Sequence, residues 1–165
     1  MKKIVALALT LCLALGLAAC GSSGKQLQIG IPADATNGAR ALLLLQDQGI
    51  ITLNDGVGLS ATERDVKDNP YNVKIVAMEA ANLPSSLPDL DFAVINGNYA
   101  LGAGLNPIED SVAIEGSESP YLNVVVVKEG NENEPFVAAL KEVLNSEEIR
   151  TFINETYGGA VVAAF

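Results

Sequence analysis

The first twenty residues constrain the fold of this 165-residue chain more than any other feature. Lys2 and Lys3 precede an apolar run over residues 4–19, which ends at Cys20. A basic start, a short apolar core and small residues before a cleavage point are the parts of a secretory signal peptide. A membrane-spanning anchor is the alternative, but this run is shorter than the ~20 residues that a spanning helix needs. We therefore expect residues 1–19 to be a signal peptide that takes no part in the folded domain.

The cleavage point also predicts a lipid anchor. Leu17-Ala18-Ala19-Cys20 resembles the lipobox of exported bacterial proteins, in which the cysteine thiol is acylated and becomes the new N-terminus. Two acyl chains attach a protein durably to a membrane, whereas one chain alone binds marginally. We expect residues 20–25 to be the lipidated Cys20 and a flexible tether, with the rest of the chain at the cell membrane and facing outside the cytoplasm.

Composition excludes several classes of protein. Cys12, the other cysteine, lies inside the expected signal peptide, so no disulfide staples the mature chain and folding depends on an apolar core. The chain has no His, which excludes Ser-His-Asp triads, Cys-His pairs and His-ligated metal centres. A carboxylate pair stays formally open for an enzyme, but no pair is marked by apolar neighbours that would raise one pKa. We expect no enzyme, no cofactor and no metal site.

Charge argues against nucleic acid as a partner. The formal net charge is −10 and becomes −12 when Lys2 and Lys3 leave with the signal peptide. The eight bases that remain are scattered singly along the chain, whereas phosphate binding needs clustered Lys and Arg. We expect the acidic residues to form a solvated surface.

Strand and helix patterns alternate along residues 26–165. Period-2 alternation and short apolar or β-branched runs predict strands at residues 26–31, 73–78, 91–95 and 121–127. Helix formers with capping residues predict helices from Asp34 or Thr36 to Gln48, at 135–144 and at 146–157, a short helix from Thr62 and a broken helical stretch at 82–88. No Asn-Gly hairpin signal joins two alternating runs. This alternation predicts an α/β fold with a layered sheet.

Two segments offer polar groups at the carboxyl ends of strands, where open α/β sheets bind ligands. In the first segment, Asn37 and Arg40 begin the helix that follows residues 26–31. The N–H groups and dipole of a helix start favour an anion, and the planar fork of Arg40 can hold a carboxylate. The alternative is structural: Thr36 only caps the helix and Arg40 solvates its exposed face.

The second segment is Asn96-Gly97-Asn98-Tyr99-Ala100, after the strand predicted at residues 91–95. Asn side chains accept from an ammonium group and donate to a carboxylate. Asn and Gly are also the usual residues of a strand-to-helix turn, which is the structural alternative. Together the two segments suit a zwitterionic amino acid that is bound without any catalytic group.

Six motifs along the chain together resemble one known family. They are Gln28-Ile29-Gly30-Ile31-Pro32, Thr36-Asn37-x-x-Arg40, Ala93-Val94-Ile95-Asn96-Gly97-Asn98-Tyr99-Ala100, Gly104-Leu105-Asn106-Pro107, Ser119-Pro120-Tyr121 and Tyr157-Gly158-Gly159-Ala160-Val161. With these motifs, residues 26–165 resemble the NlpA/MetQ family, the methionine-binding lipoproteins of bacterial ABC importers. The resemblance implies a two-lobed α/β fold of the periplasmic binding protein type II kind, D- or L-methionine as ligand, and ABC permease subunits as partners. It also implies that Arg40 and Asn37 hold the methionine carboxylate, that Asn96 contacts the amino-acid backbone, and that Tyr99 lies nearby.

One departure from the family is large. Family members carry most of the first lobe between the lipidated Cys and the strand that matches residues 26–31, whereas only residues 21–25 fill that interval here. The resemblance therefore implies that residues 26–165 are a truncated solute-binding domain, the second lobe plus the C-terminal segment. We expect the final helices to expose apolar residues that would pack on the other lobe: Val137, Leu140, Leu144, Ile149, Phe152 and Ile153.

Two functions stay open at this point. The chain is either the lipid-anchored substrate-binding component of a methionine importer, or a degenerate or structural surface lipoprotein that binds no solute and acts through protein contacts. The missing lobe favours the second function, because one lobe alone cannot enclose the methionine side chain and burial supplies much of the affinity of a small ligand.

Overall fold

The computed structural model describes residues 25–116, 119 and 121–165. The expected signal peptide, the expected lipidation site Cys20 and most of the expected tether lie outside these residues. In the part of the chain that is described, no helix has both the length and the apolar character needed to cross a membrane.

Strand β1 (Gln28–Pro32) forms the centre of a three-stranded parallel sheet with the order β4-β1-β5. It pairs along its whole length with β4 (Lys74–Met78) on one side and over two residues with β5 (Phe92–Ala93) on the other. Four of its five residues are buried in succession, as in a parallel strand covered on both faces. The strands expected at residues 26–31 and 73–78 are confirmed.

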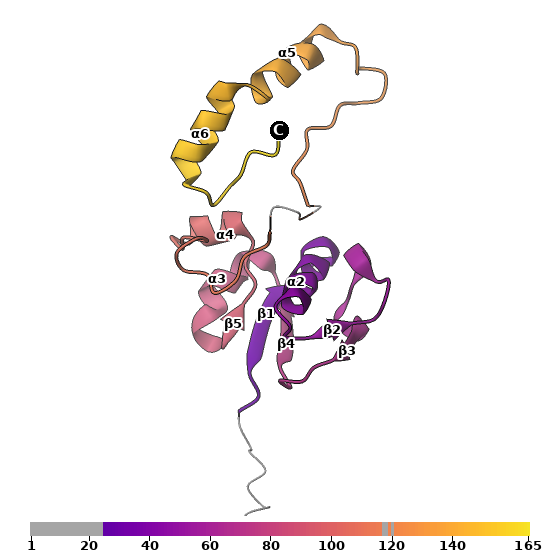
Figure 1. Ribbon diagram of the computed structural model, residues 1–165, viewed down its shortest axis with the longest axis vertical. Coiled ribbons are helices and arrows are strands. Elements are labelled where there is room, and N and C mark those ends of the chain that lie inside the picture. The colour runs from indigo at the N-terminus through magenta and orange to yellow at the C-terminus, as the bar shows by residue number, and fades with distance from the viewer. Residues whose placement is uncertain (1–24, 117–118, 120) are drawn as a thin grey trace, which may run out of the picture.

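Helix α2 (Ala35–Asp47) covers one face of this sheet (Figure 1). It begins where the Asp34 carboxylate accepts a hydrogen bond of 2.9 Å from the backbone N–H of Asn37, so the cap is Asp34 and not Thr36. Its apolar stripe packs with Ile29 and Ile31 of β1 in the main core. The buried members of that stripe are Ala39, Ala41, Leu42 and Leu45.

The opposite face of β1 packs on a broken helical stretch that contains α3 (Leu83–Ser86). Side chains alternate across a strand, so Gly30 faces away from Ile29 and Ile31. An added Cβ on Gly30 would lie 2.9 Å from Leu83 Cδ2 and 2.6 Å from Leu90 Cδ1. The backbone of β1 therefore approaches the α3 side as closely as glycine alone allows, and Leu83 is fully buried there.

A second, antiparallel sheet joins β2 (Thr52–Leu53) and β3 (Val66–Asp68). Strands this short show no period-2 pattern, so the sequence does not predict this sheet. The short helix expected from Thr62 is a 3-10 turn over Glu63–Asp65. Its capping box is complete, since the Asp65 carboxylate accepts from the backbone N–H of Thr62 at 2.8 Å.

Two predicted strands differ from the structure. The strand expected at residues 91–95 is reduced to the two residues of β5, and Phe92 is half exposed. The strand expected at residues 121–127 was wrong: these residues have no regular structure. Val124 is 74% exposed and Val126 is 84% exposed. A β-branched run becomes a strand only when a neighbouring strand accepts its ladder of hydrogen bonds.

Three further helices follow the sheet: α4 (Gly97–Gly102), α5 (Pro135–Leu144) and α6 (Glu147–Tyr157). The two predicted C-terminal helices are confirmed, with Ser146 capping α6 and Gly158 ending it in the left-handed region at φ 53°. Figure 1 shows α5 and α6 set apart from the sheet, and neither has a buried residue.

The apolar residues expected on α5 and α6 do lack full burial. Leu140, Leu144 and Phe152 are exposed, whereas Val137, Ile149 and Ile153 are half-buried. Phe136 and Val143 add to this exposed apolar surface. Exposed apolar surface of this kind indicates a partner or a tendency to aggregate.

We expect Asp34→Ala to lower the free energy of unfolding by about 1 kcal/mol at pH 7, because α2 loses its N-cap. Hydrogen bonds from Asn37 hold the pKa of Asp34 below its ordinary 3.8. The contribution of a carboxylate with a lowered folded-state pKa is complete above pH 3.8 and is lost as the pH falls through that lower value. Urea unfolding followed by circular dichroism should therefore show a gap between wild type and variant that closes in acid.

Asp47→Ala at the other end of α2 is the control for this prediction. A carboxylate opposes the helix dipole there, so its removal should leave stability unchanged or slightly raised. An equal loss in both variants would contradict the capping role of Asp34.

We expect Gly30→Ala to lower the free energy of unfolding by about 1–3 kcal/mol, because the methyl group would meet the buried Leu83 at less than van der Waals distance. Gly102→Ala in α4 is the control, since an added Cβ there meets nothing within 4 Å. Thermal unfolding of both variants checks this. Unchanged stability in Gly30→Ala would show that α3 can move away from β1 without cost.

Candidate functional site

The start of α2 and the start of α4 meet beside the carboxyl ends of β1 and β5. Asn37 and Arg40 lie one turn apart on α2, and Asn96 stands at the N-cap position of α4 without a side-chain capping hydrogen bond. The Asn96 Nδ2 group donates a hydrogen bond of 2.8 Å to Asn37 Oδ1. Asn37 also donates to the Asp34 carboxylate at 3.1 Å, which fixes the orientation of its amide. The structure thus brings together Asn37 and Asn96, which are 59 residues apart in the sequence.

Arg40 is paired with Glu115. Its Nε lies 2.6 Å from Glu115 Oε1 and 2.7 Å from Oε2, and its Nη2 also contacts Oε2. The guanidinium carbon lies 5.2 Å from the centre of the Tyr121 ring, a cation–π arrangement. The hydrogen bonds to Glu115 raise the pKa of Arg40, and partial burial opposes this rise. Arg40 is therefore fully charged and already holds one carboxylate.

Two buried polar atoms near these residues have no hydrogen-bond partner in the described part of the protein. They are Asn96 Oδ1 and the Tyr121 hydroxyl. Burial raises the pKa of Tyr121, with Arg40 acting in the opposite direction, so the hydroxyl stays neutral and able to donate or accept. Because buried polar groups are normally paired, both atoms are suited to a polar ligand group. We call Asn37, Arg40, Asn96, Glu115 and Tyr121 the Arg40 cluster.

Tyr99, the fourth residue expected in the site, is not joined to this cluster. It is half-buried within α4, and no hydrogen bond among the described residues links its hydroxyl to Asn37, Arg40 or Asn96. Of the four predicted residues, the structure joins Asn37 and Asn96 by a hydrogen bond and places Arg40 one turn along α2 from Asn37.

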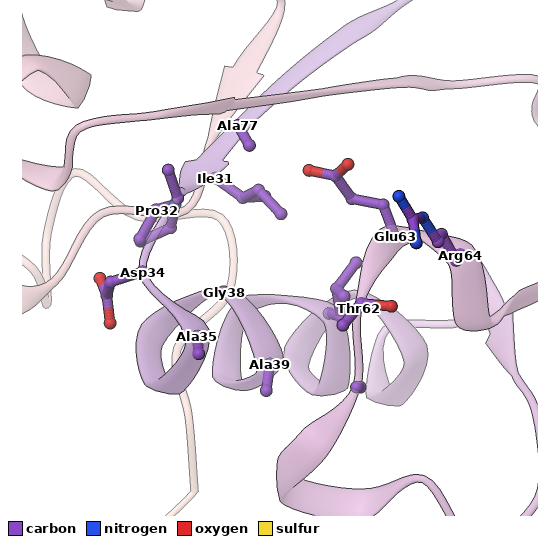
Figure 2. Close-up of a pocket in the computed structure, with 13 residues that line it drawn as sticks. Ile31, Pro32, Asp34, Ala35, Gly38, Ala39, Thr62, Glu63, Arg64 and Ala77 are labelled. Atoms are coloured by element: carbon purple, nitrogen blue, oxygen red, sulfur yellow. The ribbon is translucent and has the colours of Figure 1, made fainter.

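A shallow groove of about 280 Å³ lies on another side of the α2 start (Figure 2). Apolar residues of β1 and α2 form its floor, and Asp34, Glu63 and Arg64 stand at its rim. None of the four predicted site residues lines it. Ligand sites combine a cavity with a few polar groups, and the charged and partnerless polar groups belong to the Arg40 cluster. We therefore place the candidate site at the cluster.

Glu115 and Tyr121 were not predicted as site residues. Tyr121 lies in one of the motifs of the family resemblance, but the sequence pattern there predicts a strand. Glu115 stands 75 residues after Arg40 in a segment without regular structure, and nothing in the sequence marks it as a partner of that residue.

A model of the NlpA lipoprotein family matches residues 23–165. The D-methionine-binding lipoprotein MetQ of Escherichia coli (strain K12) is 44% identical over 137 residues, which cover 82% of this chain and 51% of that protein. Membrane lipoprotein TpN32 of Treponema pallidum (strain Nichols) is 46% identical over 135 residues, which cover 82% of this chain and 50% of that protein. The chain spans about half the length of these relatives.

Solved structures agree with the sequence relatives. A nutrient binding protein from Burkholderia cenocepacia bound to methionine has a TM-score of 0.81 at 40% identity, covering 88% of this chain and 62% of that one. An ABC transporter periplasmic substrate-binding protein from Coxiella burnetii has a TM-score of 0.79 at 39% identity, covering 87% and 61%. The predicted α/β fold, a periplasmic binding protein fold matched over part of its length, is confirmed. The chain belongs to the NlpA lipoprotein family.

Proposed function

We propose that this protein is a lipid-anchored substrate-binding component of an amino-acid importer and that its Arg40 cluster binds methionine. The observation that carries the proposal is the Asn37–Asn96 hydrogen bond at the carboxyl ends of β1 and β5, with the charged Arg40 one turn along α2 from Asn37. Relatives named as methionine-binding lipoproteins and a related structure bound to methionine support the choice of ligand.

The cluster suits both charged ends of an amino acid. A carboxylate would accept two parallel hydrogen bonds from the Arg40 fork, which are charge-assisted and directional. An ammonium group would donate to Asn96 Oδ1, a buried acceptor that has no hydrogen-bond partner among the described residues. No bond is made or broken in this scheme, and it needs no cofactor.

The transport role follows from the anchor and from the relatives. Lipidation at Cys20 would hold the protein at the outer face of the cell membrane, within reach of ABC permease subunits that receive the ligand. The relationship to an ABC transporter periplasmic substrate-binding protein supports this partner. Signal peptide, tether and solute-binding domain would then occupy residues 1–19, 20–25 and 26–165.

A second candidate is a surface lipoprotein that acts through protein contacts and binds no solute. The observation that favours it is the exposed apolar surface of α5, α6 and residues 122–127. The Arg40 and Glu115 side chains also remain 32% and 24% exposed. A site this open removes less apolar ligand surface from water than an enclosed pocket does.

We expect isothermal titration of L-methionine into the purified protein to give saturable heat, and Arg40→Ala to weaken binding by about 10- to 100-fold. The expected loss is that of a charge-assisted hydrogen-bonded pair. Arg150→Ala is the matched control, because Arg150 pairs with Glu147 on α6 and lies outside the cluster. The control should bind methionine like wild type. The Kd of D-methionine, measured in the same way, shows which enantiomer the protein prefers.

No heat from a cooperatively folded wild type would contradict methionine binding. The second candidate then predicts that the immobilised chain retains a protein from a detergent extract of membranes. Variants with substitutions on α5 or α6 should not retain it.

A further inference from the structure

We infer that Glu115 sets the affinity of the Arg40 cluster for a carboxylate ligand, because its own carboxylate occupies the guanidinium that the ligand needs. The inference rests on the proposed function, since it concerns the same site. It makes Glu115 an affinity-determining residue and an internal competitor of the ligand.

The geometry leaves little room for a second carboxylate on the same edge of Arg40. Both Glu115 oxygens lie within 2.7 Å of Nε, and one of them also contacts Nη2. The Tyr121 ring covers a face of the same guanidinium at 5.2 Å. A ligand could instead approach the other edge of the Arg40 guanidinium. A carboxylate bound there would lie close to the Glu115 carboxylate, and the two negative charges would repel each other. A ligand carboxylate therefore binds well only after Glu115 has moved.

The fold holds Arg40 more firmly than it holds Glu115. Arg40 stands on α2, whose apolar stripe is buried in the main core. Glu115 stands in residues 111–116, which have no helix or strand, and its neighbours Val112 and Ile114 are 91% and 53% exposed. Moving Glu115 breaks no ladder of hydrogen bonds and returns its carboxylate to water. The exchange replaces one guanidinium–carboxylate pair by another of the same chemistry.

Two other roles for Glu115 make opposite predictions. If Glu115 only tied residues 111–116 to α2, its neutralisation would lower stability and leave affinity unchanged. If it held the ammonium group of the ligand, its neutralisation would weaken binding. Only a competitor of the ligand gives tighter binding when its charge is removed.

Glu115→Gln tests the inference, because it keeps the size of the side chain and removes the charge. We expect titration of L-methionine to give a Kd about fivefold lower in this variant than in wild type, the scale of one part-exposed ion pair. Glu147→Gln is the matched control: it also removes one carboxylate from an ion pair with an arginine, on α6. Its Kd should equal that of wild type, which excludes a general effect of net charge. An unchanged or higher Kd in Glu115→Gln would overturn the inference.

A second probe separates this inference from the proposed function. Acetate carries a carboxylate and no ammonium or thioether group, and its binding can be followed by the NMR resonance of the Arg40 Nε–H group. We expect acetate to shift that resonance at about fivefold lower concentration in Glu115→Gln than in wild type. If methionine binds neither protein but acetate behaves in this way, the proposed ligand is wrong and the role of Glu115 stands. If acetate acts equally on both proteins, the role of Glu115 is wrong.

Discussion

The pairing of β1 with strands on both of its sides is the interaction on which the rest of the structure depends. It places β4 and β5 parallel to β1, and it directs the chain at the end of β1 into α2. Ile29 and Ile31 then meet the apolar stripe of α2 on one face, while the bare backbone of Gly30 admits Leu83 on the other. A Cβ at Gly30 would collide with Leu83, so the absence of a side chain at this position allows α3 to pack closely on β1.

Strand β1 also explains how the residues of the candidate site come together in a sheet of three strands. Parallel strands end at a common edge, so the residues that follow β1 and β5 are brought together even though they are far apart in the chain. Asn37 and Asn96 meet in this way across a hydrogen bond of 2.8 Å. Arg40 has a different environment, because its partner Glu115 comes from a segment without regular structure. In the Arg40 cluster, the edge of the sheet fixes Asn37 and Asn96, whereas no strand or helix holds Glu115.

Patterns confined to one element were predictable from the sequence, and contacts between segments were not. The leucine stripe and the caps of α2 predicted that helix, and Ser146 and Gly158 predicted the two ends of α6. The valines at 124–127 predicted a strand, yet a strand also needs a neighbour, which the local sequence does not reveal. The position of Arg40 at a helix start predicts that it binds an anion. Its pairing with Glu115 was not predictable, because it depends on how residues 111–116 pack against α2.

Because neither α5 nor α6 has a buried residue, the domain is not equally stable along its length. Local opening of these helices exposes little further apolar surface, so it needs far less free energy than unfolding of the sheet. Their amide hydrogens should exchange with solvent long before those of β1 and α2, and a protease should cut first in residues 121–134. A melting curve would then report only the sheet and the elements packed on it, while the C-terminal helices would have lost their order earlier and without a cooperative transition.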